Sequence, residues 1–194
     1  MSNILKGFNT NLGNNEYKDT DCFNNIGGVQ SVIFFDFSVI RKDLKYVNND
    51  YKQGLTIKNT PSISPSNYIK YTPFSGKINY DVNHSITNNG VHIFDHSISI
   101  NVAKRQHLID QELNTNHNAI WSLSGKGRKL LAIVIDNNGN YYALGWWSGL
   151  RMNNGGGGSG TNKNGGTTYN YSFNAPQPWF EIQITDEFKN YFNI

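Results

Sequence analysis

A single stretch, Lys129 to Trp147, constrains the fold more than any other part of this chain. It begins with the apolar run Leu130 to Ile135, which has the residues typical of a buried strand. Asp136-Asn137-Asn138-Gly139-Asn140 follows and supplies the residue types that tight hairpin turns favour. The aromatic-rich run Tyr141 to Trp147 then returns as a second strand. The stretch therefore predicts an antiparallel β-hairpin, and with it a fold that is mainly β.

Further strands are predicted before this hairpin. Val29 to Phe37 is apolar enough to be buried on both faces. In Val91 to Val102 the apolar residues alternate with Ser and Asn, and Asn88-Asn89-Gly90 before it predicts a hairpin turn. Between these strands, residues 41–66 favour turns with one or two short strands, and Tyr68 to Tyr80 favours two short strands that meet at a bend.

The C-terminal part of the chain is predicted to hold the last strands and a short helix. Thr168 to Phe173 is expected to form a strand that Pro176 and Pro178 break. Trp179 to Ile184 alternates and is expected to form another strand. Thr185 is then predicted to cap a helix that has Phe188 and Phe192 on one face.

Length and composition fit one β-rich domain with polar appendages. A chain of 194 residues has the size of a single core, and only 37% of the residues are hydrophobic and 16% charged. Residues 1–28 have too few apolar residues to bury a face and are predicted to form an N-terminal arm, with the domain at 29–194. A flanking helix is expected at Ala103 to Leu113, and the glycine-rich stretch 151–168 is expected to be a mobile loop.

Charge and cysteine content exclude several classes of protein. A formal net charge of +3 is too small for an electrostatic nucleic-acid binder, and the single Cys22 excludes an intrachain disulfide or a cluster of zinc-binding thiols. The apolar runs are far shorter than the roughly 20 residues that span a bilayer, so no membrane-spanning segment is expected. Met1 to Thr10 lacks the basic-then-apolar pattern of a secretion signal, which predicts a soluble protein made in the cytoplasm.

The histidines and glycine-rich segments predict no catalytic or metal site. His92 and His96 have a spacing that binds zinc on a helix, but on a strand it separates them by about 13 Å. The other three histidines, His84, His107 and His117, have no partner at ligand spacing. Ser124 to Lys129 precedes a strand, whereas a phosphate-binding loop follows one and opens a helix. We therefore expect no enzyme activity, no cofactor and no bound metal.

Two groups of residues remain as candidate contacts. Lys126, Arg128 and Lys129 form a small basic cluster that can meet phosphates or an acidic partner without specificity. A set of aromatic residues is expected to pack in the core or at a subunit interface, with a sugar-stacking platform as the alternative. These residues are Tyr141, Tyr142, Trp146, Trp147, Tyr169, Tyr171, Phe173, Trp179 and Phe180.

The order of these segments resembles the tail tube proteins of tailed bacteriophages. The matching parts are the glycine-led strand Gly27 to Phe35, the strand and helix Ile98 to Leu113, the run Tyr141 to Leu150, and the Gly/Thr-rich loop that leads into Tyr169 to Phe173. The resemblance spans nearly the whole chain as an order of segments and is sharpest over residues 130–173. The asparagine-rich composition is also similar to proteins of low-GC phages such as the crAss-like group.

The resemblance implies an antiparallel β-sandwich or half-barrel with one flanking helix and a short C-terminal helix. It also implies a virion structural protein of the tail, made in the bacterial host cytoplasm, whose copies close into a ring that conducts DNA. That ring, a hexamer or a dodecamer, would contact neighbouring tail, portal or connector proteins, and viral DNA only transiently. The arm, residues 41–66 and the glycine-rich loop are the segments expected to order on assembly, and the loop supplies the candidate contacts Asn153, Gly155, Gly158, Gly160, Asn164 and Gly166.

Two points stay open at the level of sequence. The ring can belong to a tail tube, a hub or a head–tail connector, and the residue pattern does not choose between them. A carbohydrate- or receptor-binding β-sandwich module of a virion is the alternative function, because Trp146 and Trp147 offer flat aromatic faces.

Overall fold

The computed structural model describes residues 28–49, 52–72, 77–103, 128–158 and 168–194, and within these residues the chain is mainly β. Its helices are α1 (Phe37–Ile40) and α3 (Asp186–Phe192). Its strands are β1 (Val29–Asp36), β2 (Leu44–Asn49), β3 (Lys52–Ile57), β4 (Ile69–Tyr71), β5 (Lys77–Ile86), β6 (His92–Ala103), β7 (Leu130–Asp136), β8 (Tyr141–Leu144), β9 (Arg151–Gly158), β10 (Thr168–Gln177) and β11 (Ile182–Gln183). No helix in this described part is long and apolar enough to cross a membrane.

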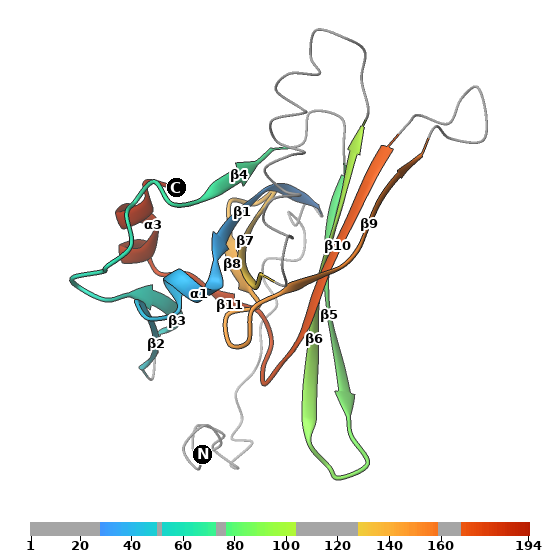
Figure 1. The fold of residues 1–194 in the computed structure, drawn as a ribbon. Helices are drawn as coiled ribbons and strands as arrows, with labels where there is room; N and C mark the ends of the chain where they lie inside the picture. The colour runs from blue at the N-terminus through green and yellow to red at the C-terminus, as the bar shows by residue number, and fades with distance from the viewer. Residues whose placement is uncertain (1–27, 50–51, 73–76, 104–127, 159–167) are drawn as a thin grey trace, which may run out of the picture.

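The elements form three layers, as Figure 1 shows. The middle layer is a five-stranded antiparallel sheet with the order β11-β8-β7-β1-β4. A four-stranded antiparallel sheet with the order β5-β6-β10-β9 covers one face of it. Helix α3 and the two-stranded sheet β2-β3 lie on the other face (Figure 1). The predicted antiparallel β-sandwich architecture with a short C-terminal helix is therefore present.

The predicted central hairpin is confirmed, but its second strand ends at Leu144 and does not reach Trp147. Strands β7 and β8 pair with Ile133 opposite Ala143. The turn between them is held by Asp136, whose carboxylate accepts hydrogen bonds from the backbone N–H groups of Asn138 and Asn140 at 2.8 and 2.7 Å. Gly139 in this turn has a φ of 79°, a conformation that glycine adopts without the steric cost that a side chain brings. The Asp-Asn-Asn-Gly sequence is thus used for its turn chemistry.

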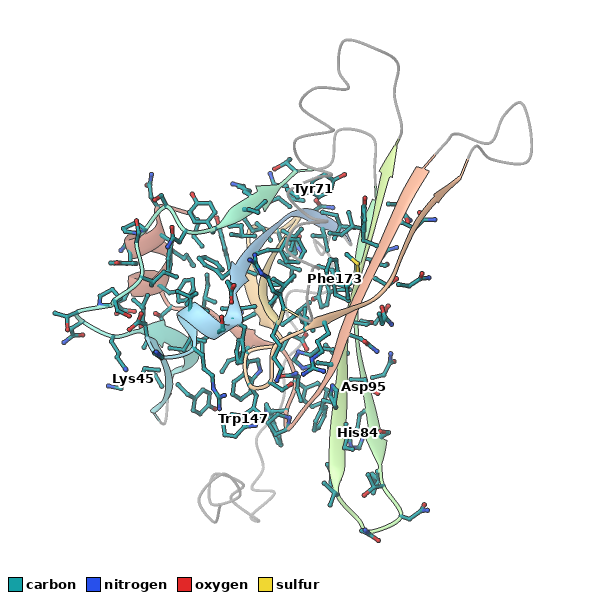
Figure 2. The ribbon with its side chains drawn as sticks, in the orientation of Figure 1. Lys45, Tyr71, His84, Asp95, Trp147 and Phe173 are labelled. Carbon is teal, nitrogen blue, oxygen red and sulfur yellow. The ribbon has the colours of Figure 1, made fainter. Side chains whose placement is uncertain are left out.

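The first core fills the space between the two large sheets. Val32 and Phe34 of β1 meet Ile98 of β6 and Phe173 of β10, and the Phe34 and Phe173 rings lie 5.4 Å apart. Figure 2 shows Phe173 on the covered side of the four-stranded sheet. Each fully buried side chain of this size contributes roughly 1.5–3 kcal/mol relative to exposure, so this layer holds the two sheets together.

The second core lies on the opposite face of the middle sheet. Here Ile33 and Phe35 of β1 alternate with the residues of the first core, and both are fully buried. Phe188 and Phe192 of α3 pack on Phe35, with ring centroids at 5.9 and 4.6 Å. The prediction that the first strand is buried on both faces is confirmed, and so is the helix, since the Thr185 hydroxyl accepts the Phe188 N–H.

Three sequence expectations need correction. The strand expected at Trp179 to Ile184 is shorter, since β11 covers only Ile182–Gln183. Residues 151–158 form strand β9, paired along β10 with Gly155 opposite Tyr171, and are not part of a loop. Strand β10 does not end before Pro176 but continues through it to Gln177. The proline is tolerated because β9 pairs with β10 only as far as Asn174, so β10 has one strand neighbour beyond that point.

Three expectations fall outside the described residues. They concern the arm at 1–28, of which only Gly28 is described, the helix at 103–113, of which only residue 103 is described, and the remainder of the glycine-rich stretch at 159–167.

Candidate functional site

The face of the four-stranded sheet that points away from the core carries short polar side chains. On β6, Ile98 and Ile100 are buried against the middle sheet, so the alternating residues Ser97, Ser99 and Asn101 face outward. Their cross-strand partners and the neighbouring outward positions continue this polar surface, which we call the open face. They are Asn79, Asp81 and Asn83 of β5, Asp95 of β6, Asn170, Ser172 and Asn174 of β10, and Arg151 and Asn154 of β9.

The open face carries few charges. Its charged residues with described side chains are Asp81 on β5, Asp95 on β6 and Arg151 on β9, which are one basic and two acidic groups. The basic residue is on a strand at the edge of the sheet. The centre of the open face therefore offers amides, hydroxyls and one carboxylate, and no cation that would hold a phosphate.

Both edges of the four-stranded sheet are open among the described residues. β5 is one edge and β9 the other, and no described strand pairs with the outer side of either. Each neighbouring pair in the sheet is antiparallel, so with four strands β5 and β9 run in opposite directions. Strand β9 ends in Gly155 to Gly158, and because glycine has no side chain, the backbone along this part of the edge is not flanked by side chains of its own strand. Such rows of free N–H and C=O groups are templates for pairing with another chain.

The β5–β6 hairpin projects beyond the middle sheet, which Figure 1 shows clearly. Its turn is built as predicted, since the Gly90 N–H donates to the Thr87 carbonyl at 2.8 Å and Gly90 has a φ of 74°. Ile86 and Val91 at the tip are 59% and 56% exposed. The hairpin therefore presents apolar side chains to solvent at its end.

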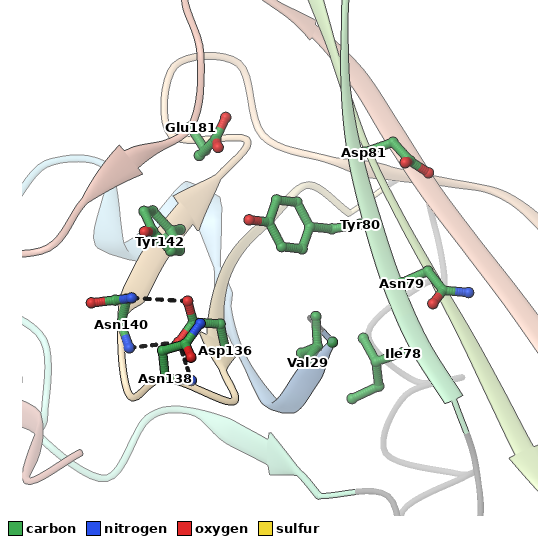
Figure 3. Close-up of a pocket in the computed structure, with 11 residues that line it drawn as sticks. Val29, Ile78, Asn79, Tyr80, Asp81, Asp136, Asn138, Asn140, Tyr142 and Glu181 are labelled. Carbon is green, nitrogen blue, oxygen red and sulfur yellow. Dashed lines mark hydrogen bonds between the residues drawn. The ribbon is translucent and has the colours of Figure 1, made fainter. Parts of the chain in front are cut away.

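A polar cavity of about 680 Å³ opens between β5 and the β7–β8 turn (Figure 3). Tyr80 and Tyr142 approach each other across it from the two sheets, and Glu181 lies beyond them (Figure 3). Its other polar lining residues are Asp136, Asn138 and Asn140, whereas Asn79 and Asp81 border it from β5 with their side chains directed toward the open face (Figure 3). No lysine or arginine is among the described residues that line it.

The cavity is electrostatically negative. Burial raises the pKa of the Tyr80 hydroxyl to about 12, and the nearby Glu181, Tyr142 and Asp136 add to this rise. For Asp136, burial favours the neutral form, but hydrogen bonds from Asn140 and Asn138 outweigh it and lower the pKa of the carboxyl. At neutral pH Tyr80 is therefore a hydrogen-bonding hydroxyl and Asp136 is a carboxylate.

Two buried polar side chains fix the loop after β8 to the four-stranded sheet. His96 of β6 is fully buried; its Nε2 lies 2.8 Å from the Trp179 carbonyl and its Nδ1 accepts the Gly145 N–H at 3.3 Å. Because Trp179 offers only a carbonyl, Nε2 must carry the proton. Gln177 of β10 accepts the Trp147 N–H through Oε1 at 3.0 Å. These bonds join the two sheets at the end where the exposed aromatic residues lie.

The structure separates the predicted contact residues. Asn153, Gly155 and Gly158 belong to edge strand β9, and Asn153 sits at a register shift between Asn154 and Met152. Gly160, Asn164 and Gly166 lie outside the described residues, as does Lys126. Arg128 is exposed, and Lys129 is half-buried with its carbonyl bonded to the Phe37 N–H. The predicted basic cluster is therefore described only at these last two residues.

The aromatic residues divide between core and surface. Tyr171 and Phe173 are core residues, and Tyr169 has no described side chain. Trp147 and Phe180 are 55% and 45% exposed. The remaining members, Tyr141, Tyr142, Trp146 and Trp179, are half-buried, and Trp146 stacks on Tyr46 at 5.9 Å. An exposed aromatic surface thus exists, but it is smaller than the set in the sequence.

Sequence reasoning missed one pair of histidines. His84 was expected to have no partner, but its Nε2 lies 2.8 Å from Nδ1 of His92 on the adjacent strand. The signal was present, because a hairpin that turns at Asn88-Asn89-Gly90 places Ile86 opposite His92 and His84 opposite Phe94. Within the described part of the chain, no group of three or more His, Cys, Asp or Glu residues is placed to hold a metal ion.

Comparison of the chain with protein-family models, with curated proteins and with solved structures finds no match.

Proposed function

We propose that this chain is a structural protein of a bacteriophage virion, whose copies join edge to edge into a ring of the tail or of the head–tail connector. The observation that supports this most is the pair of oppositely directed edges on the four-stranded sheet, which no strand of the described residues covers. The ring encloses part of the conduit through which the genome passes, and the function is geometric rather than catalytic.

The directions of the edge strands suit a head-to-tail contact. When copies are related by rotation about an axis along the strands, β9 of one copy meets β5 of the next with antiparallel polarity. The contact joins unlike surfaces, so it closes when the rotation divides a full turn. Edge pairing also satisfies the backbone groups that β5 and β9 leave free among the described residues.

The width of such a ring follows from strand spacing. Four strands at about 4.8 Å contribute roughly 19 Å of circumference per copy. Six copies give a barrel of about 37 Å between opposite backbones, and twelve give about twice that. The smaller ring surrounds a DNA duplex closely after side chains are added, so the hexamer is the better fit.

The open face has the chemistry of a lining that does not hold DNA. Tight binding to phosphates requires lysine or arginine, and the described charged side chains of this face, Asp81, Asp95 and Arg151, leave no net attraction for a polyanion. Short amide and hydroxyl side chains keep the surface wetted and the bore wide. We therefore place this face toward the axis of the ring.

Mass measurement and imaging test the proposal. Light scattering of the purified chain is expected to detect a closed oligomer, and electron microscopy is expected to show rings of sixfold or twelvefold symmetry with matching density at the tail axis of virions. A protein that is monomeric at every concentration and absent from virions overturns the proposal.

A matched pair of variants tests the edge contact itself. Asn154→Lys places a lysine on edge strand β9, where lysine blocks edge pairing, and is expected to reduce the oligomer to monomers. Asn174→Lys places the same charge on the same face but on the inner strand β10, and is expected to leave rings intact. Rings that form equally well in both variants contradict the assignment of the contact to β9.

A glycan-binding module is the second candidate, and the cavity of Figure 3 favours it. Paired tyrosines with surrounding carboxylates and amides are typical of sites that stack on a sugar ring and bond its hydroxyls. A glycan array is the test, with Tyr142→Ala to remove the cavity wall and Trp147→Ala to remove the exposed surface aromatic. An array without hits removes this candidate, whereas a hit lost only in Tyr142→Ala supports it.

A further inference from the structure

The cavity of Figure 3 has carboxylates on both sides of a pair of aromatic rings. Tyr80 enters it from β5 and Tyr142 from β8, and both are half-buried because they pack against the first core. Figure 3 shows Glu181 beyond one side of this pair and Asp136 beyond the other. The lining therefore changes in character along its length, from a carboxylate through aromatic walls to a second carboxylate.

The two carboxylates differ in their hydrogen bonding. Glu181 precedes β11, is half-buried, and makes no hydrogen bond or ion pair within the part of the chain that the structure describes. Asp136 accepts hydrogen bonds from Asn138 and Asn140 and holds the β7–β8 turn. Glu181 can therefore accept hydrogen bonds from a ligand, whereas Asp136 attracts a ligand chiefly by its charge.

The charge of the lining favours cations over anions. Glu181 and Asp136 face the cavity, Asp81 borders it, and no lysine or arginine is among its described lining residues. The chain as a whole has a formal net charge of +3, so this negative region runs against the overall charge. Among the described residues no three His, Cys, Asp or Glu side chains are placed to hold a metal ion. An organic cation, which needs carboxylates and aromatic faces rather than a coordination shell, is the chemistry that fits.

We propose that this cavity binds a linear aliphatic polyamine. One ammonium group donates to Glu181, the methylene chain runs along Tyr80 and Tyr142, and another ammonium group lies toward Asp136. Aromatic faces suit both parts of such a ligand, because they attract ammonium groups and bury methylene groups. The site goes beyond the ring function and does not depend on pairing of β5 with β9. It lies in the same cavity as the glycan-binding candidate, so the two ligands are expected to exclude each other.

Calorimetric titration of the full chain with spermidine tests the site. We expect one spermidine per chain, and we expect the affinity to fall as sodium chloride is added, because salt screens the attraction to Glu181 and Asp136. 1-Aminobutane has a single ammonium group and meets only one of the two carboxylates at a time. It is therefore expected to bind at least about tenfold more weakly than spermidine.

Two matched pairs of variants assign the binding to the cavity. Glu181→Gln keeps the shape and removes the charge, and is expected to weaken spermidine binding about fivefold or more. Glu187→Gln removes the same charge from α3, on the other face of the middle sheet, and is expected to leave the affinity within about twofold. Tyr142→Phe keeps the aromatic face and is expected to bind as the wild type does, whereas Tyr142→Leu removes that face and is expected to bind more weakly.

Three results overturn the proposal. They are the absence of saturable binding at millimolar spermidine, an equal affinity in Glu181→Gln and the wild type, and an equal loss in Glu187→Gln and Glu181→Gln, which would show attraction to the chain's acidic groups in general. Urea unfolding of each variant separates a lost contact from a lost fold. Asp136 is left unchanged in these experiments, because its carboxylate holds the β7–β8 turn.

Discussion

Acidification between about pH 6.5 and 4 is expected to destabilise this protein through one buried residue, His96. Burial lowers the pKa of this imidazole from its ordinary value of 6.5 to about 4, although the Trp179 carbonyl and the Asp95 carboxylate oppose the change. The unfolded chain therefore takes up a proton near pH 6.5, whereas the folded chain resists protonation until about pH 4. Protonation favours the unfolded state throughout this interval, and stability rises with pH.

The magnitude follows from the size of the pKa change. A shift from 6.5 to about 4 corresponds to roughly 3 kcal/mol of unfolding free energy, lost in full only below the lower value. The structure explains the cost, because Nδ1 accepts the Gly145 N–H and a protonated imidazole has no lone pair left for it. The carboxyl groups of Asp43 and Asp136 also have lowered pKa values, but they contribute only below about 3.8. These two carboxyl groups therefore change the unfolding free energy at a lower pH than His96 does.

Urea unfolding at a series of pH values measures this effect. The wild type is expected to lose about 3 kcal/mol between pH 7 and 4, and His96→Gln, which does not titrate, is expected to lose much less over the same range. The variant starts from a lower stability because the Gly145 N–H loses its acceptor. The test therefore compares how steeply the unfolding free energy of each protein changes with pH. Equal slopes, or an NMR titration of His96 centred near pH 6.5, refute the reasoning.

Three substitutions test the packing, each by urea unfolding. Gly149→Ala is expected to cost about 1–3 kcal/mol, because Gly149 has a φ of 75° and an added Cβ lies 2.6 Å from the Lys129 Cβ; a neutral result contradicts the turn geometry. Thr185→Ala is expected to lower the unfolding free energy by about 1 kcal/mol, because the helix loses its cap. Thr185→Ser keeps the capping hydroxyl and is expected to retain most of this stabilisation. Phe173→Ala is expected to cost about 3–5 kcal/mol, whereas Val91→Ala at the exposed hairpin tip stays within about 0.5 kcal/mol.

Elements whose signal is local were predicted from sequence. The β7–β8 hairpin follows from an apolar run and a turn within a few residues, and α3 follows from the cap Thr185 and the spacing of Phe188 and Phe192. In both cases the residues that decide the structure are neighbours in the chain. Burial of β1 on both faces could also be predicted from the sequence, because a strand without alternating polar residues has no face suited to water.

Strand β9 could not be predicted, because its structure is decided by a distant partner. Four consecutive glycines have no side-chain pattern and low strand propensity. They are extended because β10 offers a ladder of backbone groups, with Tyr171 opposite Gly155 and Asn170 opposite Gly156. The same limit applies to His96, whose role depends on the approach of Gly145 and Trp179 from other elements. Non-local contacts of this kind leave no periodic trace in the sequence.

The abundance of asparagine becomes informative once the register is known. Asparagine favours turns and disfavours strands, yet the open face has Asn79, Asn83, Asn101, Asn170 and Asn174 within strands. Threonine and valine have a higher strand propensity than asparagine, so we take these asparagines to serve a polar, wetted surface rather than strand stability. Asn174→Thr is accordingly expected to raise the unfolding free energy by about 0.5 kcal/mol while rings still form. A destabilised Asn174→Thr variant would show that the asparagine serves packing, and would remove this support for the conduit.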